Sequence, residues 1–268
     1  MTGLGFMMTA STVLACGIMV GLWLIQRRTG NAGIVDIGWS GSIPLLVALC
    51  GILLWTDQTR TSADVMRQVA ATMMCALWGF RLVAHIHRRS HGKPEDRRYA
   101  TLRKNWGNHA QRNLFWFFQF QAVAAALFAL PYILILRNPA PDIHPLEWAG
   151  LVLWFMAWFG EAIADQQLAA FKRNPANEGK VCDAGLWNYS RHPNYFFEWL
   201  IWCAVALAAL PAPLGWIALV CPVLMLFFLF KVTGIPATEA QALKSKGDAY
   251  RRYQKTTSVF VPWFKRKD

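Results

Sequence analysis

Residues 185–198 read Gly-Leu-Trp-Asn-Tyr-Ser-Arg-His-Pro-Asn-Tyr-Phe-Phe-Glu and lie between two strongly apolar segments. Pro193 is disfavoured inside a helix but suits the first turn of one. The sequence therefore predicts that a helix begins at Pro193. Asn194, Tyr195 and Glu198 then lie on its first two turns, and Asn194 and Glu198 share a face because they are four residues apart.

The same stretch predicts an anion site. Backbone N–H groups at a helix start attract negative charge, and Arg191 and His192 come directly before this one. A loop that only joins two membrane helices does not need so many polar side chains. We therefore expect a charged cofactor to bind here.

Composition places the chain among polytopic membrane proteins. Its 268 residues are 55% hydrophobic and 16% charged, with a mean hydropathy of +0.27. Apolar residues form long blocks rather than an amphipathic pattern, which is typical of membrane spans. The net charge of +12 would suit nucleic acid, but we exclude that partner because the basic residues gather in alternate loops.

Seven apolar blocks predict an all-α fold with seven transmembrane helices in one membrane domain. A helix of roughly 20 apolar residues crosses a bilayer core. The blocks cover residues 4–25, 34–54, 65–86, 114–136, 146–170, 195–210 and 214–232.

The distribution of charge predicts the orientation. Most of the 27 Lys and Arg residues lie in the odd-numbered loops and in the C-terminal tail, which includes Lys267. Arg60 and Arg137 lie in the opposite loops, and Arg67 and Arg81 lie inside a predicted helix. Because basic loops face the cytoplasm, we expect the N-terminus outside, the C-terminus inside, and a site that is open to the cytoplasm.

Two predicted helices contain charged residues. Asp36 lies near the start of the second apolar block. Insertion of a carboxylate costs about 3 kcal/mol at the bilayer centre, and less where the group is shallow, paired or protonated. Asp36 is therefore either functional or an interfacial residue that pairs with Arg27 or Arg28. Trp39 shares its helix face.

Arg81 lies in the third block, with Trp78 on the same face. It could hold a carboxylate such as Asp36 or Glu198, or a cofactor phosphate. His85, His87 and His91 follow, but only the last two share a face, and no carboxylate or Cys completes a ligand set. We expect no metal site.

Three further polar clusters each allow two interpretations. Residues 94–99 form either a self-compensating surface patch or a phosphate-gripping lid. Glu161 and Asp165 could hold a ribose or pair with Lys172 and Arg173. The tail after Glu239 could fold over the cytoplasmic mouth or bind anionic lipid head groups.

Several motifs, in order along the chain, resemble the steroid 5α-reductase and sterol reductase superfamily, and in particular its bacterial branch. The Arg-His-Pro-Asn-Tyr-Phe-Phe-Glu stretch is similar to its Arg-His-Pro-Asn-Tyr-x-Gly-Glu motif, with Phe197 in place of the usual Gly. The other motifs are Val-Asp-Ile-Gly-Trp, Leu-Trp-Gly-Phe-Arg, Glu-Asp-Arg-Arg-Tyr and Tyr-x-x-Tyr-x-x-Thr-x-x-x-x-x-Pro.

This resemblance implies seven helices in a bacterial cell membrane, NADPH as hydride donor, and a hydrophobic enone substrate, represented by a 3-oxo-Δ4-steroid. It implies catalytic roles for Asp36 and Trp78 and substrate contacts for Trp39 and Arg81. Trp78 stands near the position of a tyrosine in the family, so this sequence lacks the phenol of that tyrosine. The implied cofactor contacts are Arg89, Arg97, Arg98, Tyr99, Glu161, Asp165, Lys172, Lys180, Tyr189, Arg191, His192, Asn194, Tyr195, Glu198, Glu239, Tyr250 and Tyr253.

The reduction of an enone requires a hydrogen-bond donor at the ketone oxygen. Hydride addition to the β-carbon of an enone places negative charge on the ketone oxygen, and a donor there stabilises the enolate. A carboxylic acid donates only when it is protonated, which burial favours, so Asp36 is a candidate. No Gly-x-Gly-x-x-Gly motif follows a strand, so helices and loops must build the NADPH site.

Two other functions fit parts of the sequence. Membrane methyltransferases of the isoprenylcysteine and phospholipid types carry a similar Arg-His-Pro element and use S-adenosylmethionine, which has no phosphates. A non-catalytic lipid-binding or assembly protein is the third possibility, although the polar density of residues 191–198 disfavours it. The sequence predicts neither the physiological substrate nor the oligomeric state.

Overall fold

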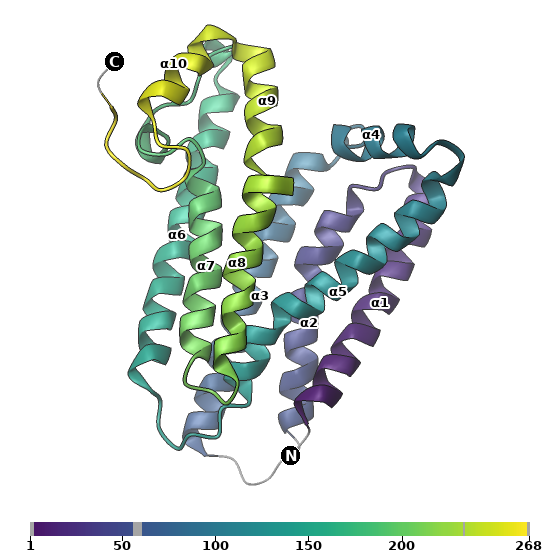
Figure 1. Cartoon of the computed structure of the whole chain (residues 1–268), viewed down its shortest axis with the longest axis vertical. Coiled ribbons are helices and arrows are strands. Elements are labelled where there is room, and N and C mark those ends of the chain that lie inside the picture. The colour runs from purple at the N-terminus through teal and green to yellow at the C-terminus, as the bar shows by residue number, and fades with distance from the viewer. Residues whose placement is uncertain (1–2, 56–60, 233, 267–268) are drawn as a thin grey trace. The chain divides into compact units, whose positions relative to one another are not determined.

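The protein is all-helical. The computed structural model describes residues 3–55, 61–232 and 234–266. Helix accounts for 81% of the described residues, which form no strand, and this confirms the all-α part of the predicted fold (Figure 1). Two of the basic residues named above, Arg60 and Lys267, lie outside the described residues.

The chain forms two compact units, Met1–Ile143 with Pro211–Gly215, and His144–Leu210 with Trp216–Asp268. The single membrane domain expected from the sequence stays a prediction.

The first unit contains α1 (Leu4–Thr29), α2 (Ile34–Trp55), α3 (Ser62–Ser90), α4 (Arg97–Trp106), a short 3₁₀ turn and α5 (Ala110–Leu136). Small residues let these helices approach closely. A Cβ added at Gly38 of α2 would lie 2.2 Å from Leu22 of α1, and one added at Gly79 of α3 would lie 2.3 Å from Pro44 of α2. Close helix contacts through glycine are typical of membrane helix packing.

Arg67, an arginine inside a predicted span, has a structural explanation. Its side chain is buried, and its guanidinium donates to the backbone carbonyls of Ala140 and Asp142, both at 2.6 Å. These bonds tie α3 to the loop after α5 within the first unit. Arg67 is near the start of α3, where Thr61 and Asp64 form a reciprocal capping box.

The second unit contains α6 (Pro145–Arg173), α7 (Pro193–Ala209), α8 (Val220–Phe227), a π-helical segment (Phe228–Val232), α9 (Ile235–Lys246) and α10 (Asp248–Thr256). Helix α7 begins at Pro193, which occupies the first turn, so the predicted helix start is confirmed. Helices α6 and α7 pack side by side (Figure 1). A Cβ at Gly150 would lie 2.7 Å from Ala208.

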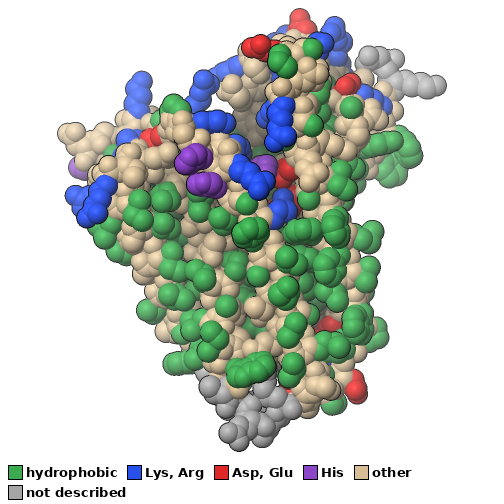
Figure 2. All heavy atoms as spheres, turned by 180° about the vertical axis from the view of Figure 1, so that it is seen from behind, with side chains coloured by type: hydrophobic (Ala, Val, Ile, Leu, Met, Phe, Trp, Pro, Cys, Tyr) green, Lys and Arg blue, Asp and Glu red, His purple; other side chains and the backbone are tan. Residues whose placement is uncertain are grey.

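Six helical segments of the described chain are long and apolar enough to cross a membrane: Leu4–Thr29, Ile34–Trp55, Ser62–Ser90, Arg97–Leu136, Pro145–Arg173 and Gly215–Lys246. The seventh predicted span corresponds to α7, which has 17 residues and is not among them. Figure 2 shows hydrophobic side chains over much of one face of the molecule. The chain is therefore a multi-pass membrane protein, and seven spans and the orientation of the termini stay predictions.

Phe197, which departs from the motif, lies against a glycine of the neighbouring helix. A Cβ built at Gly160 of α6 would come within 2.5 Å of the Phe197 ring. The residue that replaces the usual glycine is therefore accommodated by a second glycine, in the α6–α7 contact.

Replacing Gly160 by Ala should lower the thermal unfolding temperature in detergent, because overpacking of this kind costs about 1–3 kcal/mol. Adding Phe197→Ala to Gly160→Ala should restore part of the loss. Gly17→Ala is the matched control, since nothing lies within 4 Å of a Cβ at that helical glycine. Equal unfolding temperatures for the Gly160 and Gly17 variants would contradict the close contact.

Candidate functional site

The loop before α7 is fixed by specific contacts within the second unit. Gly185 has a φ of +60°, a conformation that favours glycine, and a Cβ there would lie 2.5 Å from the Gln167 amide of α6 and displace it. The Gln167 side chain accepts from the Leu186 amide at 2.9 Å. The Trp187 indole donates to the Ala164 carbonyl at 2.9 Å. The loop is therefore held against α6.

Glu239 of α9 is the centre of a polar cluster at the start of α7. Its Oε1 accepts from Arg191 Nε at 2.7 Å and lies 3.3 Å from His192 Nε2. Its Oε2 accepts from Gln254 Nε2 of α10 at 2.8 Å. Tyr250 also donates to this carboxylate, at 3.5 Å. One side chain thus joins α9, α10 and the loop before α7, and we call these five residues the Glu239 cluster.

Arg191 is engaged inside this cluster. In addition to Glu239, its Nη1 donates to the carbonyls of Gln254 at 2.9 Å and Thr257 at 2.6 Å. Its side chain is only 10% exposed. The sequence predicted that Arg191 meets an anionic cofactor. In the structure it pairs with a carboxylate of the protein, and its role as a phosphate ligand stays a prediction.

The two tail tyrosines predicted as cofactor contacts are buried on α10. Burial and the neighbouring Glu239 carboxylate raise the pKa of the Tyr250 phenol, so this group keeps its proton near neutral pH. The Tyr253 hydroxyl donates to the backbone carbonyls of Trp187 and, at 3.2 Å, Ser190. Tyr253 therefore binds the tail to the loop before α7.

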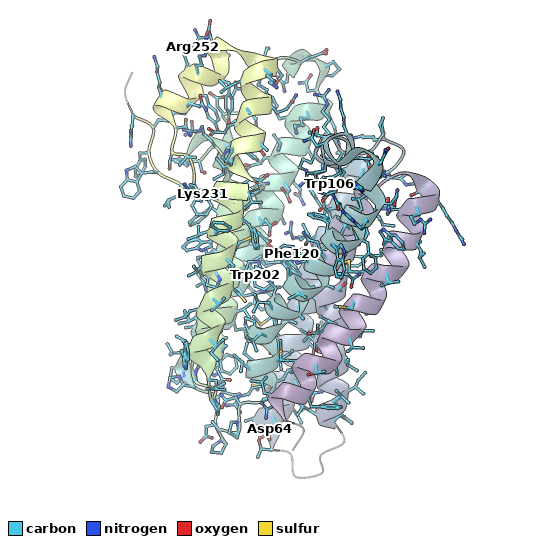
Figure 3. The ribbon with its side chains drawn as sticks, turned by 45° about the vertical axis from the view of Figure 1, so that its right-hand side comes forward. Asp64, Trp106, Phe120, Trp202, Lys231 and Arg252 are labelled. Carbon is cyan, nitrogen blue, oxygen red and sulfur yellow. The ribbon has the colours of Figure 1, made fainter. Side chains whose placement is uncertain are left out.

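The first turns of α7 present a second group of polar side chains. Asn194 Nδ2 donates to Asp165 Oδ1 of α6 at 3.2 Å, and both residues are half-buried. Glu198 is buried and accepts from the Trp202 indole at 2.9 Å; Figure 3 labels Trp202. The Asn194–Asp165 contact brings together two residues that the sequence placed in one cofactor site.

The remaining predicted residues of the second unit surround these contacts. The Tyr195 ring stacks on His192 with a centroid separation of 5.4 Å, and its hydroxyl lies 3.3 Å from that of Thr238. Glu161 is buried on α6. Three predicted residues are exposed, namely Lys172, Lys180 and Tyr189.

In the first unit, Asp36 forms a compact network with α4. Its Oδ1 accepts from the Tyr99 hydroxyl at 2.5 Å, and its Oδ2 accepts from Arg98 Nη2 at 2.9 Å. The sequence predicted that an interfacial Asp36 pairs with Arg27 or Arg28. This prediction is wrong, because Asp36 pairs with Arg98 and the guanidinium of Arg27 lies over the Trp23 ring. Both oxygens of Asp36 therefore act as hydrogen-bond acceptors in this network.

Residues 94–99 combine self-compensation with the contacts to Asp36. Arg98 also pairs with Asp96 at 3.0 Å, and Arg103 pairs with Glu95 at 2.9 Å. Burial alone would raise the pKa of Asp96, but the hydrogen bonds and charge of Arg98 outweigh it and lower this pKa. Asp96 also caps α4 by accepting from the Arg98 amide, so the negative charge lies where a helix start favours it.

An aromatic cluster lies one turn beyond Asp36 on α2. The Trp39 ring packs edge to face against Trp78 at 5.9 Å and against Phe128 at 5.4 Å. Trp78 is fully buried, whereas Arg81, one turn further along α3, is half-buried. The predicted substrate residues Trp39 and Trp78 are therefore in direct contact.

Two other predicted residues of this unit, Arg89 and Arg97, are exposed. The His87 and His91 rings lie 4.9 Å apart, but the described part of the chain contains no group of three or more side chains that could hold a metal ion.

The structure adds residues that the sequence did not single out. Gln254 completes the Glu239 cluster, and Gln167 fixes the loop at Gly185. Glu95 accepts from the Ala32 amide at 2.7 Å as well as from Arg103. Nothing in the local sequence marks Gln254 or Gln167, because their partners are far away in the chain. The acidic and basic residues at 95–98 did signal a paired patch.

The long apolar helices define a multi-pass membrane protein, and each unit contains a polar network, one around Asp36 and one around Glu239. Residues 22–257 match the family described as Protein of unknown function (DUF1295). The chain therefore belongs to the DUF1295 family. No curated protein and no solved structure matches it.

Glu239→Ala should lower the thermal unfolding temperature clearly, because it leaves the charge of Arg191 without its partner in a poorly solvated place, a loss of about 3 kcal/mol for a broken buried pair. Asp248→Ala is the control, since the Asp248 and Arg251 side chains are 80% and 68% exposed. Unfolding followed by intrinsic fluorescence in detergent measures both. Similar shifts would show that the Glu239 cluster does not stabilise the tail.

Proposed function

We propose that the chain is an NADPH-dependent reductase that reduces the C=C bond of a conjugated enone in a hydrophobic substrate, represented by a 3-oxo-Δ4-steroid. Membership of DUF1295, a family associated with steroid 5α-reductase-like membrane proteins, supports the proposal. The motif resemblance supports it over most of the chain. The single observation that carries it is the contact between Asp36 and the Tyr99 phenol.

The resemblance calls for a carboxylate and a phenol at the ketone, and it leaves a tryptophan, Trp78, where the phenol should be. Tyr99 supplies a phenol from α4 and donates to Asp36 at 2.5 Å. A phenol has one hydrogen to donate, so in our proposal this hydrogen turns from Asp36 to the ketone oxygen as negative charge develops there. Asp36, which Arg98 holds in place, positions the phenol until the substrate binds. The rings of Trp39 and Trp78 would contact the flat substrate.

NADPH would supply the hydride. In the second unit, Asn194 and Asp165 offer an amide and a carboxylate in contact with each other, which fits a nicotinamide amide and ribose hydroxyls. Lys172 and Lys180 are exposed cations that fit the pyrophosphate and the 2′-phosphate. In the first unit, Arg89 and Arg97 are exposed cations of the same kind. The remaining polar residues predicted for the cofactor would orient these groups.

The basic loops also support an orientation, and the resemblance to the bacterial branch supports a place. In our proposal the chain lies in a bacterial inner membrane, with its N-terminus outside, its C-terminus in the cytoplasm and the nucleotide site facing the cytoplasm. The substrate would enter from the lipid, and NADPH from the water.

One observation favours a second candidate. Arg191 is already paired with Glu239, so the Arg-His-Pro element does not by itself argue for a cofactor with phosphates. A membrane methyltransferase that uses S-adenosylmethionine would need no such cation. Cofactor binding separates the two proposals.

Titration calorimetry on detergent-purified protein should show NADPH binding and no S-adenosylmethionine binding. Asn194→Ala should weaken NADPH binding, because the amide contact is lost, while Lys104→Ala on the exposed face of α4 serves as a charge control. Binding of S-adenosylmethionine alone would overturn the reductase proposal and favour a lipid or prenyl-thiol methyl acceptor.

Tyr99→Phe should lower kcat for enone reduction by about 100-fold, the cost of removing one donor to a developing oxyanion. NADPH affinity and the unfolding temperature report whether the variant is otherwise intact. Asp36→Asn should reduce kcat less, because the asparagine oxygen can still accept from Tyr99. An unchanged kcat in Tyr99→Phe would remove the phenol from the mechanism.

A further inference from the structure

The C-terminal residues 258–266, which we call the C-terminal hook, carry an unusual group of exposed apolar side chains. Val261, Trp263 and Phe264 are 52%, 68% and 75% exposed. Lys265 and Arg266 follow directly and are also exposed. The hook lies beyond residues 22–257, the part matched by the family, and the proposed reduction does not use it.

These side chains are exposed although the backbone of the hook is held in place. The Trp263 amide donates to the Tyr189 carbonyl at 2.9 Å, and the Arg266 amide donates to the Thr256 carbonyl at 2.8 Å. At the start of the hook, the Arg191 amide donates to the Ser258 carbonyl at 2.8 Å. The aromatic rings are therefore presented by an ordered segment.

The hook is anchored at the end of the apolar helices. Phe260 is buried, and its ring lies 5.7 Å from that of Phe196 on the first turn of α7 and 5.2 Å from that of Phe230, next to Lys231. Lys231, labelled in Figure 3, directly follows the apolar residues 219–230. Aromatic side chains at this level, where apolar helix surface gives way to charge, are typical of the membrane–water interface.

The hook also contains a small pocket. A cavity of about 200 Å³ is lined by Ser258, Val261, Trp263, Phe264 and Arg266. Its lining residues comprise one arginine, one serine, two aromatic residues and one aliphatic residue. This combination suits a phosphate group that is attached to an apolar body. A free phosphate would leave the apolar walls in contact with water.

We propose that the C-terminal hook binds an anionic phospholipid of the bilayer that the helices span, with Trp263 and Phe264 at the interface and Arg266 on the head group. Charge complementarity supports an anionic lipid, because Lys244, Arg251, Arg252 and Lys255 add positive charge to the same tail. Lys265 is paired with Asp183 at 3.3 Å, so Arg266 is the cation that lines the pocket. The lipid would hold the tail, and with it α10, against the membrane.

The test uses full-length protein in nanodiscs that contain lipid brominated near the head-group end of its acyl chains. The fluorescence difference between the wild type and Trp263→Phe isolates the signal of Trp263. We expect brominated phosphatidylglycerol to quench this signal more strongly than brominated phosphatidylcholine at the same mole fraction. The attraction of one basic side chain to an anionic surface corresponds to about a fivefold local enrichment, which sets the expected ratio.

Arg266→Gln should bring the quenching by the two lipids to equality, whereas Arg251→Gln, an exposed control on α10, should leave the preference in place. Trp216, which is 65% exposed, is the control for the quencher, and its signal should not depend on lipid charge. Absence of quenching at Trp263 by either lipid would overturn the proposal. Equal quenching in the wild type would overturn the selectivity for an anionic head group.

Discussion

A carboxylate that is withdrawn from water needs cations or hydrogen-bond donors from the protein itself, and Asp36 in the first unit and Glu239 in the second both meet this need. Asp36 accepts from Tyr99 and Arg98, and Glu239 accepts from Arg191, Gln254 and Tyr250. Both lie where an apolar helical region gives way to an amphipathic segment. In each unit the carboxylate therefore fixes the amphipathic segment on the ends of the longer helices.

The Glu239 cluster has a direct bearing on the proposed cofactor site. Arg191 and His192 precede the helix start that carries Asn194, so their position depends on Glu239 and hence on the docking of α9 and α10. An anion that reached Arg191 would compete with Glu239 for the same guanidinium. Nucleotide binding and the packing of the tail would then be linked, because one cation serves both.

The local sequence predicted the features that neighbouring residues determine, namely where helices begin and which segments are helical. Pro193 marked the start of α7 because its ring excludes a helix interior, and the apolar blocks gave the helical segments because their length matches a bilayer. It did not predict contacts between distant residues. Asp36 and Arg98 are 62 residues apart, and Arg191 and Glu239 are 48 apart. The rotation of each helix decides such pairs, and composition does not specify it.

The contact between Gly160 and Phe197 constrains how this part of the sequence can change over time. The ring occupies the space that a side chain at position 160 would need, so the two positions are not independent. A chain with glycine in place of Phe197 would have room for a larger residue at position 160. An evolutionary change that moves the large residue from position 197 to position 160 passes through one of two intermediates. One has large residues at both positions, which overlap sterically, and the other has small residues at both, which leaves a cavity but no overlap. We therefore expect the two positions to covary, with the aromatic residue lost before the glycine is replaced.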